Sequence, residues 1–397
     1  MSQTAMHAAT ETTTNKAPLR VPPETESPQR GFFLRATAAA VRFGIGVVLC
    51  QGVLTAVLVV GWAQRWLERR VYSYWWRRSP ARDRGLAFDD YLSRVDRPIS
   101  QPALPRWITA DPSNTPASRR VRWFGSLVAN FGRGLPAAAN AFLWLLPATA
   151  LWYVAWVLGW NISFHKLYEQ SPIGATLGVS GVALFAALLL YLPVALARQA
   201  VTADPRRFYD LRLNWLLTRN AAWGGVQTAA FAAAVGSVVM VLRIAPYFLG
   251  GSEEIAALPP AQQLAWLKSY YLAAGIVVLG GYLLTWLLAA RVYAAAALRA
   301  FLSGAGPKLT HVEQNAFASL GYQPTERAET GSPLWKTSRS FAGGGWTAAG
   351  LAAASLAWVA VATEVFVGQF FHYIPGLGWL NHPLLVLPYF KYLPPGL

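Results

Sequence analysis

Cysteine and charge are both scarce in this sequence. One of the 397 residues is a cysteine and 13% are charged, whereas 54% are hydrophobic. The single cysteine, Cys50, has no intrachain partner for a disulfide and cannot build a cysteine-based metal site. Although the net charge is +16, so low a charged fraction argues against a soluble nucleic-acid-binding protein. The composition instead favours a membrane protein whose charges are crowded into a few loops.

Six apolar stretches are long enough to cross a bilayer. A spanning helix needs about 20 mostly apolar residues, because about 30 Å of hydrocarbon is crossed at about 1.5 Å per residue. We therefore predict an all-α transmembrane bundle over residues 31–371, between a disordered tail at 1–30 and a Pro- and aromatic-rich outer-face tail at 372–397. The spans are predicted near residues 43–62, 135–160, 173–197, 221–244, 270–290 and 345–371.

Basic residues fall mainly on one side of this predicted topology. Of the 34 Lys and Arg residues, 25 lie in the segments 63–134, 198–220 and 291–341. The alternating segments hold only Lys166, Arg243, Lys268 and Lys391. The positive-inside rule assigns the first group of segments to the cytoplasm, so the C-terminus is predicted to lie outside.

The first span fits this pattern least well. A full span places the N-terminal tail outside, although the tail and the start of the span carry Lys16, Arg20, Arg30, Arg35 and Arg42. The alternative is a re-entrant hairpin over residues 31–64 that turns near Gly44–Gly46 or Gln51–Gly52 and leaves both ends in the cytoplasm. We favour the full span, and both arrangements stay open. Residues 1–30 contain no apolar core of a cleavable signal peptide.

Aromatic residues and arginines alternate in the segment after the first span. This composition suits the level of the lipid phosphates, where aromatic rings face the interface and guanidinium groups reach the headgroups. We predict that the segment lies along the inner leaflet and binds anionic lipids. The predicted lipid-contacting residues are Arg65, Arg69, Arg70, Arg77, Arg78, Trp66 and Trp75.

A second amphipathic helix is predicted between the third and fourth spans. Asp204 is its expected N-cap and Pro205 its first helical residue. Phe208, Leu211 and Trp215 recur at three and four residues and would form its apolar face, while Asn214 faces elsewhere. The pattern leaves open whether this helix docks on the bilayer, on its own bundle or on a partner.

Glu364 is a carboxylate well inside an apolar stretch. A charge there costs on the order of 3 kcal/mol, which makes it a candidate functional residue. Counted from the predicted cytoplasmic ends of their spans, Glu364 and Arg243 lie at similar depths, so we consider an intramembrane ion pair between them. The alternative, slightly favoured, is that each side chain reaches the outer headgroups independently.

Four residues on the predicted outer side are weak candidates for a metal site: His165, Glu169, His372 and His382. His165 and Glu169 are four residues apart and would share a helical face, but scattered interfacial histidines explain these positions better. P-loop, Rossmann, HExxH and GxSxG signatures are missing from the relevant contexts. We therefore predict no metal, no cofactor and no catalytic residue, and we lean against an enzyme. Gly174, Gly178 and Gly181 have the spacing of a helix–helix contact.

Two stretches carry a resemblance to a known group of proteins. They are VLCQGVLTAVLVVGWAQR, at residues 48–65, and NISFHKLYEQSPIGATLGVSGVALFAALLLYLPVALARQAVTADPRRFYDLRLNW, at residues 161–215. Together they resemble multi-pass inner-membrane proteins of bacteria that have no assigned activity. The resemblance implies a location in the bacterial inner membrane, and it carries over no catalytic residue.

Three functions are therefore expected, in decreasing order. The first is a non-enzymatic subunit, scaffold or assembly factor of a membrane complex, indicated by Ala- and Gly-rich packing faces and few buried polar groups. The second is a permease or channel for a small or lipophilic solute with Glu364 lining the path, although no internal repeat is evident. The third is an outer-face lipid-modifying enzyme that uses the four candidate metal-site residues. The predicted partners are the lipid bilayer, anionic inner-leaflet lipids and other membrane proteins, and not nucleic acid.

Overall fold

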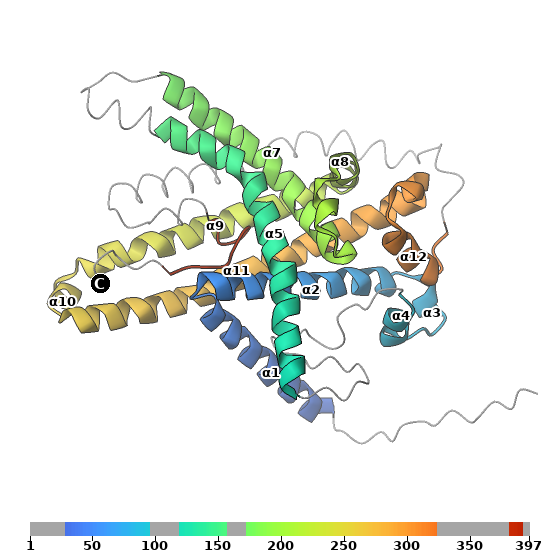
Figure 1. Cartoon of the computed structure of the whole chain (residues 1–397), viewed down its shortest axis with the longest axis horizontal. Helices are drawn as coiled ribbons and strands as arrows, with labels where there is room; N and C mark the ends of the chain where they lie inside the picture. Colours follow the sequence, from blue (N-terminus) through green and yellow to red (C-terminus); the bar gives the residue numbers. More distant parts are fainter. Residues whose placement is uncertain (1–27, 96–118, 157–171, 324–380, 392–397) are drawn as a thin grey trace, which may run out of the picture. The chain divides into compact units, whose positions relative to one another are not determined.

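The computed structural model describes residues 28–95, 119–156, 172–323 and 381–391 (Figure 1). By its contacts the chain divides into Met1–Val41 and Arg42–Leu397. Of the first unit, the structure describes residues 28–41, which form the N-terminal part of helix α1 (Pro28–Leu49).

Every regular element in the described part of the chain is helical, as the sequence predicts. Four helices are long and apolar enough to cross a membrane, at Phe124–Ala155, Thr176–Thr202, Ala222–Gly250 and Pro260–Lys308. In chain order the elements after α1 are α2 (Val53–Arg77), α3 (Pro80–Asp83), α4 (Phe88–Arg94), α5 (Arg119–Trp156), α7 (Pro172–Thr202), the 3-10 helix η2 (Pro205–Tyr209), α8 (Leu211–Asn220), α9 (Ala222–Gly250), α10 (Glu253–Ala256), α11 (Pro260–Ala300), the π-helical turn η3 (Phe301–Ala305), the 3-10 helix η4 (Gly306–Lys308) and α12 (His311–Ser319).

Helices α9 and α11 form an antiparallel hairpin, with α10 at its tip (Figure 1). The hydroxyl of Tyr270 on α11 donates to the carbonyl oxygen of Leu242 on α9 at 2.6 Å. Nearer the middle, a Cβ at Gly281 would lie 2.5 Å from Val235, so the missing side chain lets the two helices approach closely.

Helix α2 packs against α11 and runs parallel to it. Near its start, the Gln51 amide donates to the carbonyl oxygen of Tyr271 at 3.3 Å. Near its end, the Trp75 indole donates to the carbonyl oxygen of Ala294 at 2.9 Å. Because residue numbers rise together along both helices, α2 and α11 end on the same side of the bundle (Figure 1).

Helix α5 crosses α2 at a contact between backbones. A Cβ at Gly61 would lie 1.7 Å from the carbonyl oxygen of Asn130, and one at Gly134 would lie 2.0 Å from that of Val57. Only glycine fits at either position without moving a helix.

Helix α5 also packs against α7, through two of the glycines identified in the sequence. Gly181 of α7 faces Leu151 and Trp152, and a Cβ at Gly178 would lie 3.8 Å from that of Ala155. Gly174 lies on the same helix. The α5–α7 contact is therefore built on small residues of α7.

The predicted first span, residues 43–62, is not one helix. Helix α1 ends at Leu49 and α2 begins at Val53, with Gly52 in an extended conformation (φ −129°, ψ 143°). The Thr55 hydroxyl donates to the carbonyl oxygens of Leu49 at 2.5 Å and Gly52 at 3.0 Å, which satisfies backbone groups exposed by the break. The break occurs at one of the two turns considered for a re-entrant hairpin, Gln51–Gly52.

The predicted spans near 135–160, 173–197, 221–244 and 270–290 overlap helices α5, α7, α9 and α11. Helix α5 begins at Arg119 rather than near residue 135, and it continues through Pro136 and Pro147. The short helices α4 and α12 lie outside these long helices. The predicted sixth span, 345–371, lies outside the described residues.

Candidate functional site

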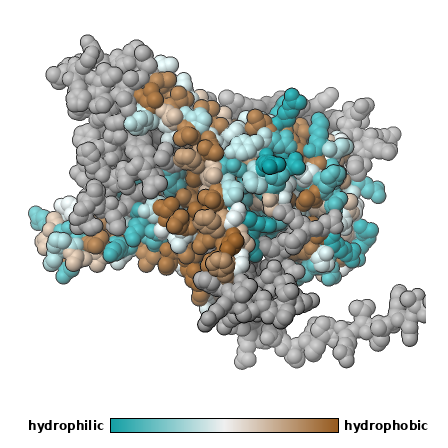
Figure 2. Space-filling view, viewed as in Figure 1, coloured by the Kyte–Doolittle hydropathy of each residue, from teal (hydrophilic) through white to brown (hydrophobic). Residues whose placement is uncertain are grey.

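Three chain segments that the charge pattern assigns to the same side meet at one end of the second unit. The Tyr322 hydroxyl donates to the carbonyl oxygen of Trp75 at 3.0 Å, and the Ala81 N–H donates to that of Leu320 at 3.2 Å. The Arg299 guanidinium donates to the carbonyl oxygen of Asn220 at 2.7 Å. We call this region the polar end; it comprises α3, α4, η2, α8, α12 and the C-terminal ends of α2, α7 and α11. Hydrophilic residues gather there in Figure 2, while hydrophobic residues cover the middle of the view.

The centre of the polar end is a buried arginine, Arg198, close to the C-terminus of α7. Its Nη1 lies 2.9 Å from a carboxylate oxygen of Asp210 and donates to the side-chain oxygen of Asn214 at 3.3 Å. Its Nε lies 3.4 Å from the carboxylate of Glu313 on α12. One guanidinium group therefore joins α7 to η2, α8 and α12.

Glu313 is buried, and both of its carboxylate oxygens are engaged. The Tyr293 hydroxyl of α11 and the Arg198 guanidinium donate to Oε1. Oε2 accepts from the backbone N–H and the hydroxyl of Thr310, each at 2.7 Å, in a capping box that begins α12. The carboxylate is thus fully used in joining α12 to α7 and α11.

Asn214 extends the same network to the start of α8. Its side-chain amide donates to the Tyr191 hydroxyl at 2.9 Å and to the carbonyl oxygens of Arg207 and Phe208, each at 3.0 Å. The Tyr191 hydroxyl in turn donates to the carbonyl oxygen of Phe208. These bonds satisfy backbone groups at the turn between η2 and α8, which would otherwise be buried without partners.

The second predicted amphipathic helix therefore has a different buried face from the one expected. Asp204 caps it by accepting from the backbone N–H of Arg206 at 3.0 Å, as predicted, but the first turn is the 3-10 helix η2. Asn214 is buried, whereas Leu211 and Trp215 are 46% and 40% exposed. The polar network places Asn214 inward, so this segment docks on its own bundle through a mixed face.

Two of the predicted lipid-contacting residues are instead inside the protein. Trp75 is completely buried and packs against Phe317 with ring centroids 4.6 Å apart, in addition to its bond to α11. Arg65 is buried and donates to the side-chain oxygen of Asn130 at 3.0 Å. The prediction of lipid contact was wrong for both residues, because their side of α2 is covered by α11, α12 and α5. Nearby, Arg133 of α5 forms an ion pair with buried Glu68.

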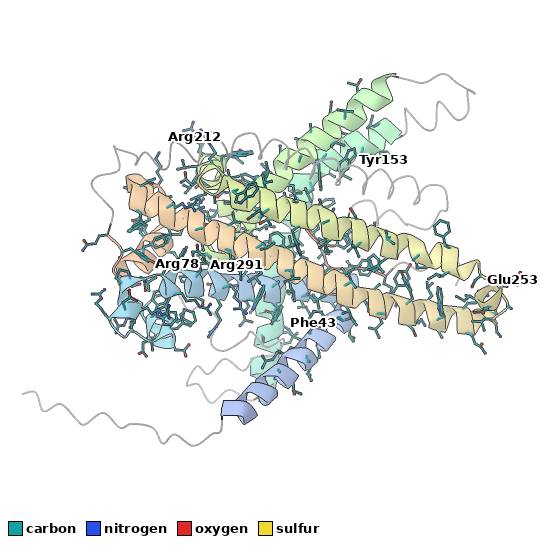
Figure 3. The ribbon with its side chains drawn as sticks, turned by 180° about the vertical axis from the view of Figure 1, so that it is seen from behind. Phe43, Arg78, Tyr153, Arg212, Glu253 and Arg291 are labelled. Carbon is teal, nitrogen blue, oxygen red and sulfur yellow. The ribbon has the colours of Figure 1, made fainter. Side chains whose placement is uncertain are left out.

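The remaining arginines of this stretch lie nearer the surface. The Arg78 guanidinium lies 3.8 Å from the centre of the Tyr74 ring, and the Arg70 guanidinium lies 5.2 Å from that of Trp66. Arg69 lies 5.2 Å from the Phe88 ring and 3.6 Å from a carboxylate oxygen of Asp89. Arg77 is exposed. Figure 3 shows Arg78, Arg291 and Arg212 toward the polar end, and Glu253 toward the opposite end.

The residues predicted to act on the outer side are only partly within the described chain. Arg243 is buried on α9, 5.9 Å from the centre of the Phe390 ring. His382, which lies outside the four candidate spans, stacks on Phe185 with ring centroids 6.0 Å apart. Burial, followed by the positive charge of Arg243, lowers the pKa of His382 to about 4. Glu364, His165, Glu169 and His372 lie outside the described residues, so the ion pair and the shared histidine site stay predictions. Within the described ranges, no group of three His, Cys, Asp or Glu residues could hold a metal ion.

Comparison with known proteins adds no functional information. No protein-family model, no curated protein and no solved structure matches this chain. The geometry of its own residues is therefore the basis for the proposals that follow.

Sequence reasoning missed the Arg198–Glu313 network. The partners are far apart in the chain, and no motif connects them. The one local signal was Thr310 followed three residues later by Glu313, which is the pattern of a capping box. That signal predicts a helix start but does not reveal the arginine that the same carboxylate binds.

Proposed function

We propose that this chain is a non-enzymatic polytopic membrane protein that acts as a subunit, scaffold or assembly factor of a membrane complex. The buried charges of the polar end support a structural role. Glu313 and Arg198 bind each other and the surrounding helices, so their hydrogen-bonding groups connect elements of the fold. A catalytic carboxylate would instead need a free oxygen directed at a substrate.

The observation that carries this proposal is an exposed face on the N-terminal half of α5. Phe124, Val128, Phe131 and Leu135 are 65%, 54%, 36% and 49% exposed and recur at four, three and four residues, so they form one stripe. Gly125, Ala129 and Gly132 are exposed beside that stripe. A Cβ at Gly125 or Gly132 would meet no atom within 4 Å.

This exposed face has the composition of the α5 faces that are already in helix contacts. On the side facing α2, Gly134 permits a backbone approach that any other residue would prevent. Small residues at the surface of a membrane helix offer little area to lipid chains but allow a second helix to approach closely. We therefore propose that a helix of a partner protein packs along Gly125, Ala129 and Gly132.

The topology expected from the sequence is part of the same proposal. We propose a bacterial inner-membrane location, with the polar end on the cytoplasmic side and the C-terminus outside. Three segments rich in basic residues converge at the polar end, which supports placing them on one side of the membrane. Four of the predicted spans correspond to helices long and apolar enough to cross a membrane, which is compatible with this placement, and the first and sixth spans remain predictions.

The test is purification of the full chain from its native membranes in mild detergent, followed by identification of co-purifying proteins. The variant Gly132→Leu fills the proposed contact, and the open space around Gly132 lets the larger side chain fit within the fold. Gly236→Leu on α9 is the matched control, because a Cβ there also meets no atom within 4 Å. We expect a stoichiometric partner with the native chain and the control, and its loss with Gly132→Leu. A monodisperse native chain without a partner would contradict the proposal.

A further inference from the structure

Three arginines from two helices form a group of positive charge at the polar end. Arg70 and Arg77 lie on α2, seven residues apart and therefore on the same helical face. Arg291 lies on α11. All three are exposed, and within the described part of the chain none of them forms an ion pair with a carboxylate.

The parallel packing of α2 and α11 brings these arginines to one level. Trp75 of α2 bonds to Ala294 of α11, and Arg291 comes three residues before Ala294. Since both helices rise about 1.5 Å per residue in the same direction, Arg291 lies level with a point on α2 between Arg70 and Arg77. Arg291 also directly follows the predicted span 270–290, at the depth expected for phosphate groups of the lipid.

The neighbouring groups add positive charge rather than neutralise it. Burial, followed by the charges of Arg77, Arg69 and Arg291, lowers the pKa of Arg70, which lies outside the candidate spans. Arg82 donates from its Nη1 to the carbonyl oxygen of Arg77 at 3.0 Å. The carboxylate of Asp89 lies 3.6 Å from Arg69, which is not one of the three arginines. An anion between α2 and α11 would relieve this repulsion.

We propose that Arg70, Arg77 and Arg291 form a binding site for the phosphate of an anionic lipid headgroup, between α2 and α11. The Arg70 guanidinium lies over the Trp66 ring, 5.2 Å from its centre. This contact limits the directions in which the guanidinium can point. Arginine suits this role because its planar group donates two parallel hydrogen bonds to a phosphate. The site differs from general attraction to the inner leaflet because it requires residues from two helices. The inference does not rest on the proposed role in a complex.

The test compares lipid binding to the purified full-length protein by native mass spectrometry. Dioleoylphosphatidylglycerol, dioleoylphosphatidylcholine and inorganic phosphate are the three probes. The main variant is Arg70→Gln together with Arg291→Gln. Arg212→Gln is the matched control, because Arg212 is also an exposed arginine near the polar end but lies on α8 (Figure 3).

We expect the native protein to bind phosphatidylglycerol at least about tenfold more tightly than phosphatidylcholine, because the site adds charge-assisted hydrogen bonds. The double variant should lose this preference, and Arg212→Gln should keep it. An unchanged preference in the double variant, or an equal loss in Arg212→Gln, would overturn the proposal. Binding of phosphate without a preference between the two lipids would overturn the assignment to a lipid. If the double variant does not elute as a folded species, the single variant Arg77→Gln, exposed on the surface of α2, provides the same comparison.

Discussion

The guanidinium of Arg198 on α7 lies 3.4 Å from the carboxylate of Glu313 on α12, with side-chain exposures of 1% and 0%. This ion pair connects segments that are 115 residues apart in the sequence. Because Tyr293 of α11 donates to the same carboxylate, the pair also holds α12 against α11. The position of α12, and with it much of the polar end, therefore depends on one buried carboxylate.

Replacing Glu313 by glutamine should destabilise the protein strongly. The variant keeps the shape of the side chain but leaves Arg198 buried with Asp210 as its remaining carboxylate. We expect the free energy of unfolding to fall by about 3 kcal/mol, since removing one partner of a buried ion pair leaves the charge of Arg198 only partly compensated. Reversible unfolding in detergent would measure this change.

A surface ion pair provides the control for this experiment. Arg207 lies 3.2 Å from Asp204, but the two side chains are 45% and 37% exposed. Arg207→Gln should therefore change the free energy of unfolding by less than about 1 kcal/mol. Equal effects of the two substitutions would show that the buried pair has no special role.

Alanine at Gly134 should disrupt the crossing of α2 and α5. The new Cβ would lie 2.0 Å from the carbonyl oxygen of Val57, so the helices would have to separate. We expect a loss of at least about 2 kcal/mol, as for other overpacked contacts. In contrast, Gly132→Ala on the same helix meets open space and should be neutral or slightly stabilising. Thermal unfolding of both variants would measure the contrast, and similar transition temperatures would refute the close contact.

Phenylalanine at Trp75 tests whether this residue is internal. The substitution keeps an aromatic ring but removes the hydrogen bond from the indole to the carbonyl oxygen of Ala294. It also leaves a small cavity beside Phe317. We expect a loss of about 2 kcal/mol in the free energy of unfolding, from the lost hydrogen bond and the lost packing. A variant as stable as the native chain would favour the interfacial position that the sequence predicted.

The pKa of His382 predicts a loss of stability in mild acid. Its folded value of about 4 lies below the usual 6.5, so the unfolded chain binds a proton first as the pH falls. The stability is therefore complete above pH 6.5 and is lost as the pH falls toward 4. Between about pH 7.5 and 5 the free energy of unfolding should fall by about 2 kcal/mol from this residue.

His382→Gln isolates this contribution from that of other titrating groups. The variant cannot take up the proton, so its stability should depend less on pH over the same interval. Unfolding curves recorded for both proteins across the interval would give the difference. Parallel curves for the two proteins would show that His382 is not held in its neutral form by burial.

The sequence predicted the helical architecture better than it predicted which residues are buried. Apolar stretches near 173–197, 221–244 and 270–290 correspond to α7, α9 and α11, because length and hydrophobicity alone define a long apolar helix. Trp75 was misplaced because a buried amphipathic helix and an interfacial one have the same composition. Leu67, Val71 and Trp75 recur every four residues and are all buried. Their periodicity therefore indicated a buried helix face, which the composition of the segment did not.

Long-range polar contacts could not be predicted in the same way. The sequence placed Asn214 away from the apolar face of its helix, because Phe208, Leu211 and Trp215 define that face by their spacing. The structure buries it, since Tyr191 on α7 and the carbonyl oxygens of Arg207 and Phe208 supply its partners. Hydrogen bonds from Asn214 to protein groups, in place of water, depend on the tertiary arrangement. A local sequence pattern does not contain that information.

Photo-crosslinking in native membranes would show whether the exposed stripe of α5 contacts another protein. A photoreactive amino acid would replace Val128 on α5 and, in the control, Val238 on α9, which are 54% and 50% exposed. We predict a discrete protein adduct from position 128 and lipid adducts from position 238. Lipid adducts alone at both positions would contradict such a contact.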